Sequence, residues 1–207
     1  MKKLVFLPLA IALVALISCD SNEPIVETNP LPIGSKIPKP EVKMKDISGK
    51  EVTLKEAFKE NGLLVMFSCN TCPAVKANQG RTREISKYAL EKNVGIILLN
   101  SNEGQRDDED SFEAMKDYAK KQGYNWFYAV DQNSVLADAF GANRTPECFL
   151  FNKEESLVYY GAIDDNPKDA ENIKRAHLKE AINEMLNGKE VTVKTSRSVG
   201  CGIKRQS

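Results

Sequence analysis

Two cysteines separated by two residues are the feature of this 207-residue sequence with the clearest chemical potential. The stretch FSCNTCPAV, residues 67–75, places Cys69 and Cys72 on either side of Asn-Thr, and Pro73 follows at once. Such a pair can bind a metal ion, form a structural cross-link or exchange electrons with other thiols. Which of these it does depends on the elements that position it.

The residues on both sides of the pair predict a turn between a strand and a helix. Residues 63–68 (LLVMFS) form a continuous apolar run, which is typical of a strand buried on both faces. Residues 73–90 predict a helix, because a first helical turn tolerates proline. A helix N-terminus favours thiolate over thiol. We therefore expect Cys69 to be the more reactive thiol, close to the helix N-terminus and to solvent.

The other two uses of the thiols have less support. Zinc usually takes four ligands, but the chain has no second C-x-x-C pair, and its one histidine, His177, falls in a helical stretch. A zinc site would have to draw on the four cysteines beyond the N-terminal segment: Cys69, Cys72, Cys148 and Cys201. A purely structural disulfide inside C-x-x-C closes too small a ring to restrain the unfolded chain much. Electron exchange is favoured, and it needs no metal or cofactor.

The rest of the chain alternates between predicted strands and helices. Residues 41–45 and 51–54 flank Ser48-Gly49 and predict a β-hairpin. Further segments follow in order, with strands at 94–99, 126–130, 148–151 and 157–160, and helices at 112–121, 134–140 and 170–186. This alternation predicts an α/β fold with a mixed central sheet, helices on both faces and an antiparallel edge made by the last two strands.

Composition limits the number of domains and the kinds of partner. The chain is 42% hydrophobic and 28% charged, which suits one globular domain, expected over residues 41–188 with a C-terminal extension at 189–207. Lys+Arg and Asp+Glu both total 29, so the formal net charge is zero. This balance lacks the basic excess of nucleic-acid-binding proteins, and no nucleic-acid partner is expected.

The N-terminal residues have the pattern of a secretory targeting signal. Lys2 and Lys3 precede an apolar run over residues 4–17, which ends at Ser18-Cys19. The ending LISC resembles the lipobox of bacterial lipoproteins. The alternative is an ordinary cleaved signal with an incidental cysteine.

The lipobox resemblance implies that residues 1–18 are a signal peptide and that Cys19 carries the lipid. Residues 19–40 contain five prolines and predict an extended tether. We expect an extracytoplasmic protein held to a bacterial membrane through this lipid.

Two motifs together resemble the thioredoxin-like fold. The first is the strand, C-N-T-C-P and helix around residues 69–73, and the second is R-T-P-E at residues 144–147, directly before the strand CFLF. The hairpin segment DISGKEVTLKEAF and the body are similar to the redoxin group, which peroxiredoxins and membrane-tethered thiol-disulfide oxidoreductases share. The resemblance extends over about residues 33–186.

This resemblance implies a thiol-disulfide oxidoreductase acting on protein thiols and disulfides, supplied by an upstream thiol-disulfide electron partner. Cys69 would attack the disulfide of a substrate, and Cys72 would release the product. Pro146 would be a cis-proline facing the two cysteines, and Thr145 before it would offer its backbone to an extended substrate. Without the resemblance, a trans proline would be the default.

The sequence also departs from these relatives. Thioredoxins carry a tryptophan before the first cysteine and a buried aspartate on the preceding strand, whereas this chain has Ser68 and no acidic residue between Gly62 and Ser68. A peroxiredoxin-like peroxidase is an alternative, but the P-x-x-x-T/S-x-x-C pattern fails. Counted back from Cys69, the hydroxyl position holds Met66. A non-catalytic thioredoxin-fold lipoprotein is a further alternative.

Two cysteines and an acidic loop remain. Cys148 and Cys201 could form a structural disulfide, Cys201 could act as a relay to the C-x-x-C pair, or both could stay unpaired. The run RDDEDS, residues 106–111, lacks the spacing of a calcium loop and predicts an acidic loop that caps a helix.

Overall fold

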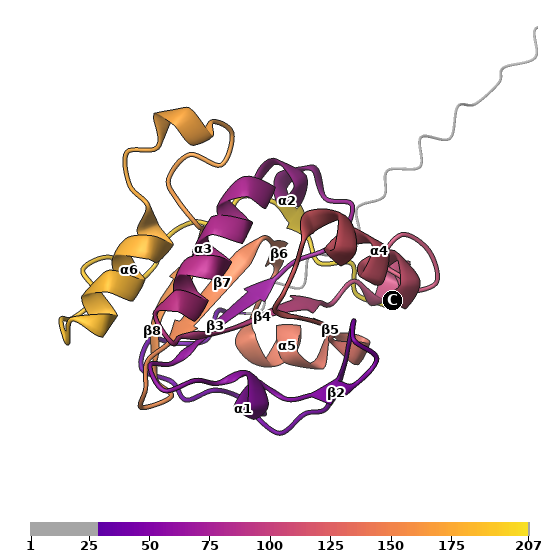
Figure 1. Ribbon diagram of the computed structural model, residues 1–207, viewed down its shortest axis with the longest axis horizontal. Helices are drawn as coiled ribbons and strands as arrows, with labels where there is room; N and C mark the ends of the chain where they lie inside the picture. Colours follow the sequence, from indigo (N-terminus) through magenta and orange to yellow (C-terminus); the bar gives the residue numbers. More distant parts are fainter. Residues whose placement is uncertain (1–28, 207) are drawn as a thin grey trace, which may run out of the picture.

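The computed structural model describes residues 29–206 and shows an α/β molecule built on one central sheet (Figure 1). Cys19 and the expected signal peptide lie outside the described residues. No helix within residues 29–206 is long and apolar enough to cross a bilayer. The strands of the sheet are β1 (Met44–Asp46), β2 (Glu51–Val52), β3 (Leu63–Phe67), β4 (Gly95–Asn100), β5 (Phe127–Val130), β7 (Glu147–Phe151) and β8 (Leu157–Gly161).

In the described part of the chain the strands are ordered β2-β1-β5-β4-β3-β7-β8. The three central strands β3, β4 and β5 are parallel, whereas β1, β7 and β8 pair antiparallel with their neighbours. The sheet is therefore mixed, and β7 and β8 make the predicted antiparallel edge. Parallel strands end at the same edge of a sheet, so the loops after β3 and β4 lie together there.

The N-terminal hairpin is confirmed, but both strands are shorter than predicted, and the first begins only at Met44. β1 and β2 pair antiparallel, but Leu54 already belongs to the next helix, α1 (Leu54–Ala57). The Thr53 hydroxyl accepts from the Glu56 backbone N–H, and the Glu56 carboxylate accepts from the Thr53 backbone N–H. This capping box starts the helix and so ends the strand.

Helices cover both faces of the sheet, as predicted (Figure 1). On one face pack α3 (Gln79–Glu91), α4 (Phe112–Gln122) and α6 (His177–Leu186), and on the other pack α1 and α5 (Val135–Phe140).

The central strand β3 shows why its sequence is apolar throughout. Leu63, Val65 and Phe67 contribute to the core beneath α1 and α5, and Leu64 and Met66 to the core beneath α3. All five side chains are fully buried. A strand covered on both faces has no position for a polar side chain, which explains the continuous run.

The helix predicted for residues 73–90 is two helices. α2 (Pro73–Ala77) ends at Asn78, and α3 begins directly after it. Asn78 departs from helical geometry at φ −91° and ψ 0°, and its side-chain amide donates to the carbonyl of Ala74 at 2.8 Å. Asparagine side chains compete in this way with backbone hydrogen bonding, which makes Asn78 a natural break.

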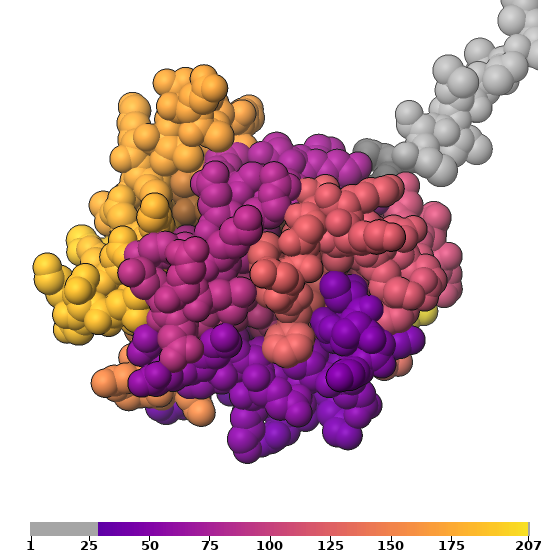
Figure 2. Space-filling view, viewed as in Figure 1, coloured from indigo at the N-terminus to yellow at the C-terminus, as the bar shows by residue number. Residues whose placement is uncertain are grey.

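The final helix starts later than predicted. Instead of one helix over residues 170–186, a 3-10 turn forms at Ala170–Asn172, and α6 begins only at His177. The loop before this turn is held by a buried ion pair, in which Arg81 Nη1 lies 2.9 Å from both carboxylate oxygens of Asp164. This segment projects from the body, coloured orange in Figure 2. Within it, carbonyl groups accept from the loop and not from a helix: Arg175 O from the Asp165 N–H at 3.1 Å and Asn172 O from Asn166 Nδ2 at 3.1 Å.

The C-terminal extension returns to the domain. The Tyr160 N–H donates to Lys194 O at 3.0 Å, which places the extension along the β8 edge. Further on, β9 (Cys201–Gly202) pairs antiparallel with β6 (Arg144–Thr145). The end of the chain lies near α4 in Figure 1. The last residues therefore pass the loops that hold the C-x-x-C pair.

Candidate redox site

The C-x-x-C pair lies at the predicted turn between a buried strand and a helix. Ser68 separates Cys69 from the end of β3, and Cys72 is the N-cap residue of α2, with Pro73 in its first turn. The Ser68 N–H donates to Leu99 O, which extends the β3–β4 ladder up to the pair. The sheet thus fixes the backbone that enters the site.

The environment of Cys69 differs from the expectation. The side chain is only 1% exposed, and Cys72, not Cys69, caps the helix. Burial raises the pKa of the Cys69 thiol above its ordinary value of 9.0, and it outweighs the hydrogen bond from Thr145, which lowers this pKa. The expectation that Cys69 is exposed to solvent is therefore wrong, although the backbone N–H groups of Thr71 and Cys72, at the start of α2, do lower its pKa.

Cys201 forms a disulfide with Cys72, across 129 residues of sequence. The two Cα atoms are 6.0 Å apart, within the ordinary range for a disulfide. Cys69, Cys72 and Cys201 share one small apolar cluster with Ala74 and Val75, and we call these three residues the cysteine cluster. Among the described residues Cys69 keeps a free thiol.

The proposed pairing of Cys148 with Cys201 is therefore wrong. Cys148 stands opposite Met66 in the β3–β7 ladder, and its side chain is fully buried in the core beneath α3 and α6. Burial raises the pKa of this thiol far above its ordinary value. Cys201 instead stands opposite Thr145 in the β6–β9 pair. The Cys148 side chain lies in the core on the α3 and α6 face of the sheet.

A four-cysteine zinc site has no structural counterpart, because Cys148 is separated from the cysteine cluster. Within residues 29–206, no three or more histidine, cysteine, aspartate or glutamate side chains are arranged to hold a metal ion.

Thr145 contacts both cysteines of the motif. The Thr145–Pro146 peptide bond is cis, as the family resemblance implies. Thr145 Oγ1 lies 3.3 Å from Cys69 Sγ, and Thr145 O lies 3.5 Å from Cys72 Sγ. The backbone that the resemblance assigns to an extended substrate is paired here with the chain's own β9, with Thr145 opposite Cys201.

A buried carboxyl group, that of Asp110, holds the turn between the cysteines, whereas the acidic run at residues 106–111 predicted only a loop that caps a helix. Asp110 Oδ1 accepts from the Asn70 backbone N–H at 2.8 Å and from Asn100 Nδ2 at 2.7 Å, while its Oδ2 accepts from Asn102 Nδ2 at 2.7 Å. Asp110 is fully buried, and its negative charge contributes to the raised pKa of Cys69.

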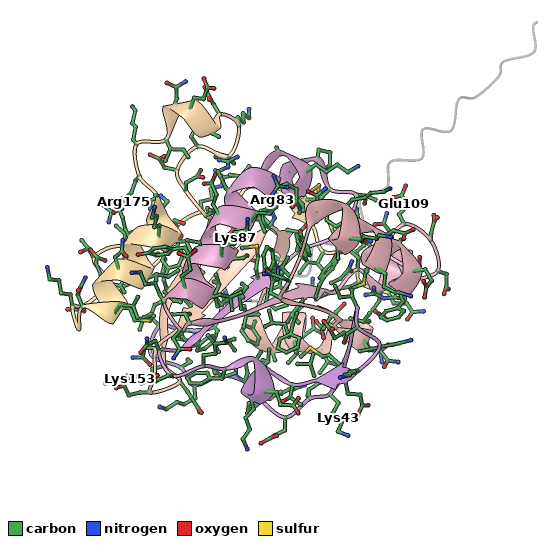
Figure 3. All side chains as sticks on the ribbon, viewed as in Figure 1. Lys43, Arg83, Lys87, Glu109, Lys153 and Arg175 are labelled. Carbon is green, nitrogen blue, oxygen red and sulfur yellow. A yellow bond between two sulfur atoms is a disulfide. The ribbon has the colours of Figure 1, made fainter. Side chains whose placement is uncertain are left out.

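The Asn70 side chain is fixed as well. Its amide donates to Glu109 O at 3.0 Å, and the Tyr128 hydroxyl donates to its carbonyl oxygen at 2.9 Å. Glu109 marks this acidic loop in Figure 3. This contact could have been expected from the two buried strands β3 and β4. Adjacent parallel strands end at one edge of the sheet, which brings the loop after β4 beside the turn after β3. As predicted, the same loop caps a helix, since the Ser111 hydroxyl accepts from Ala114 N–H at the start of α4.

An open depression of about 310 Å³ gives access to the cysteine cluster. All three cysteines line it, together with Lys76 and Lys204. A larger groove of about 600 Å³ lies beside α6 and β8, but no cysteine lines it. The smaller depression is the one relevant to thiol chemistry.

A thioredoxin-like sheet with a C-x-x-C turn opposite a cis-proline defines a thioredoxin-fold redox protein. Residues 32–176 match the family model described as Redoxin. The chain belongs to the redoxin family.

Solved structures share the fold of this chain. A hypothetical protein from Sinorhizobium meliloti 1021 is 30% identical, with a TM-score of 0.78 over 86% of this chain and 97% of that chain. An uncharacterized conserved protein from Geobacillus kaustophilus is 31% identical, with a TM-score of 0.80 over 87% and 96%. A thioredoxin-like protein in its oxidized form is 20% identical, with a TM-score of 0.60 over 77% and 100%, and shows the fold alone. None of the curated proteins matches this sequence.

Proposed function

We propose that this protein is a thiol-disulfide oxidoreductase that exchanges electrons with protein disulfides through Cys69 and Cys72. The observation that carries the proposal is the cysteine cluster itself, in which the Cys69 thiol lies beside the Cys72–Cys201 disulfide against the cis-proline loop. A thiol next to a disulfide is the pair of reactants of thiol-disulfide exchange.

The reaction starts with Cys69 and Cys72 both reduced. The Cys69 thiolate attacks one sulfur of a substrate disulfide, and the other substrate sulfur leaves as a thiolate. Cys72 then attacks Cys69 Sγ, which forms the Cys69–Cys72 disulfide and releases the substrate as a dithiol. Two electrons have moved to the substrate, and an upstream thiol partner must return them.

Burial sets a condition on the first step. Only the thiolate attacks, and burial opposes the charge on Cys69. Thr145 Oγ1 and the backbone N–H groups of Thr71 and Cys72 lower the pKa of Cys69 and oppose this effect. Substrate binding at the depression would have to leave these donors in place while it brings the substrate sulfur to Cys69.

The peroxidase alternative has less support. A peroxidatic cysteine needs a hydroxyl donor three residues earlier on the chain, and Met66 occupies that place in the core. The raised pKa of Cys69 does not separate the two functions, because both need its thiolate. A non-catalytic role has less support again, because all three residues of the cysteine cluster line the same open depression.

We place this activity outside the cytoplasm, at a membrane. The basic and apolar N-terminus with its lipobox-like LISC supports a lipid on Cys19. The tether expected over residues 19–40 is too long, because Leu31 N–H donates to Phe140 O at 2.9 Å and Ile37 is buried in the core. Residues 19–28 would then connect the lipid to the redox domain and hold it near the bilayer surface.

Reduction of insulin by the full-length protein, with dithiothreitol as electron source, tests the activity. Cys69→Ser should abolish turnover because the attacking thiol is lost, and Cys72→Ser should accumulate mixed disulfides that cannot be resolved. Cys148→Ala is the matched control, since this thiol is buried in another layer and should not affect turnover. Turnover by Cys69→Ser at the wild-type rate would refute the proposal.

A further inference from the structure

The C-terminal tail is held against the redox site on both sides of Cys201. After it, the Ile203 N–H donates to Asn143 O at 3.0 Å, and the Gly104 N–H donates to Lys204 O at 2.8 Å. Before it, the Gly200 carbonyl accepts from the Arg144 guanidinium at 3.2 Å. Cys201 is thus presented by a segment with defined contacts.

Gly200 allows the tail to come close to the cis-proline loop. A Cβ atom at this position would lie 2.0 Å from Thr145 O, which no side chain can occupy. The next glycine differs, because a Cβ on Gly202 would meet its nearest atom, Asn143 O, only at 4.0 Å. Glycine is therefore required at position 200, where β9 approaches the cis-proline loop, but not at position 202.

The tail occupies the place that the proposed function gives to a substrate. β9 adds to β6 as an antiparallel strand, and Cys201 stands opposite Thr145, the residue before the cis-proline. Its sulfur is bonded to Cys72. An extended segment that brings a cysteine to the dithiol is what a protein substrate would provide, but this one belongs to the same chain.

We propose that Cys201 is a third redox-active cysteine, an intramolecular substrate that takes the disulfide over from the C-x-x-C pair. This inference rests on the proposed function and extends it. The Cys201 thiolate attacks Cys72 Sγ of the Cys69–Cys72 disulfide. The bond between Cys69 and Cys72 breaks, the bond between Cys72 and Cys201 forms, and Cys69 leaves as a thiolate that takes a proton from solvent.

No electrons enter or leave in this step, because one disulfide replaces another. What changes is the exposure of the sulfurs. Cys69 and Cys72 are 1% and 4% exposed, whereas Cys201 is half-buried. The disulfide is therefore moved to the sulfur that an upstream thiol protein can reach. Attack of that partner's thiolate on Cys201 Sγ would release Cys72 as a thiolate and form a mixed disulfide between Cys201 and the partner. A second thiol of the partner would then displace Cys201, which leaves both cysteines reduced and the partner with a disulfide.

Trypsin separates the two disulfides in one peptide map. Cleavage after Lys59 and Lys76 gives one peptide with both Cys69 and Cys72, and cleavage after Arg197 and Lys204 gives a second peptide with Cys201. A Cys69–Cys72 disulfide stays inside the first peptide. A Cys72–Cys201 disulfide joins the two.

The experiment titrates the full-length protein with glutathione buffers, quenches with acid, blocks thiols and maps the peptides without reduction. A wild-type sample should contain some molecules with the Cys69–Cys72 disulfide and others with the Cys72–Cys201 disulfide. The ratio of the two should change as the acid quench is delayed. Cys69→Ser should contain only the joined peptides, and Cys201→Ser only the internal disulfide. A joined pair that is present in every oxidised molecule and never exchanges would show a structural cross-link and overturn the proposal, as would a Cys201 thiol that is always free.

Two glycine variants test the role of the tail without removing a sulfur. Gly200→Val should lower the joined fraction at least about fivefold, because the effective concentration of Cys201 at Cys72 falls when β9 is displaced. Gly202→Ala should leave this fraction unchanged. Equal fractions of disulfide-joined peptides in Gly200→Val and Gly202→Ala would show that the approach of β9 at Gly200 does not bring Cys201 to Cys72. Insulin reduction is measured in parallel, so that loss of activity with intact exchange refutes the proposed function alone, and activity without exchange refutes the third cysteine alone.

Discussion

At the scale of single residues, the balance around Cys69 decides its reactivity. The side chain is almost completely buried, and burial opposes the thiolate more strongly than its hydrogen-bond donors favour it. Thr145 Oγ1, at 3.3 Å, is the leading favourable contact. A cysteine at a helix N-terminus is thus activated only to the extent that its charge stays solvated.

The pH dependence of Cys69 alkylation tests this balance in protein that carries the Cys72–Cys201 disulfide. Because the pKa of Cys69 lies above 9.0, the thiolate fraction is small at pH 7 and increases about tenfold per pH unit until the pH reaches this pKa. The rate of reaction with iodoacetamide should follow, without a plateau at neutral pH.

Thr145→Val is the companion variant, since it keeps the branched shape and removes the hydroxyl. Its profile should move to still higher pH. A plateau below pH 7 in the wild type, or a shift to lower pH in Thr145→Val, would contradict the assigned balance.

At the scale of elements, two loops that follow parallel strands form the support of the site. The turn after β3 carries the cysteines, and the loop after β4 places Asp110 beneath Asn70. The Asp110 carboxyl group accepts only from amide N–H donors, so the turn is held by hydrogen bonds to a buried side chain. The acidic loop is therefore part of the redox site as well as the cap of α4.

Asp110→Asn should have two effects. Replacing an acceptor oxygen by an NH2 group opposite N–H donors should lower the free energy of unfolding by about 1–3 kcal/mol, measured by urea denaturation. Removing the negative charge should also lower the pKa of Cys69 and speed its alkylation at pH 8. Asp108→Asn is the control, because Asp108 is exposed in the same loop and should change neither quantity. Unchanged stability in Asp110→Asn would show that the carboxyl group does not hold the turn.

At the scale of the whole molecule, the two ends of the chain have opposite roles. The C-terminal residues return to the redox site and place Cys201 beside Cys72, whereas the N-terminal residues are proposed to attach the protein to a membrane. The C-terminal tail therefore belongs to the redox domain, even though the family match ends at residue 176.

The anchor is tested by Cys19→Ala. Without the thiol that would carry the lipid, the protein should lose incorporation of labelled fatty acid and move from the membrane fraction to the soluble fraction. Cys148→Ala, which removes a thiol far from the N-terminus in sequence, should leave both unchanged. A Cys19→Ala protein that remains with the membrane would refute the lipid anchor.

The sequence by itself determined the features that depend on neighbouring residues. The apolar run of β3 and the proline at the start of α2 predicted where the C-x-x-C turn would lie, because burial periodicity and helix starts are local properties. The family resemblance pointed to Pro146, and the peptide bond before it is cis. The mixed sheet with its antiparallel edge also followed from the order of the segments.

Only the tertiary structure decided which sulfurs meet. Cys72 and Cys201 are 129 residues apart, and their contact depends on the pairing of β9 with β6 and on the space beside Gly200. The burial of Cys69 and its contact with Thr145 likewise arise from segments that are distant in sequence. Spacing along a chain indicates which thiols can react, but the partner of each thiol is set by distances in space, which the packing of the whole domain determines.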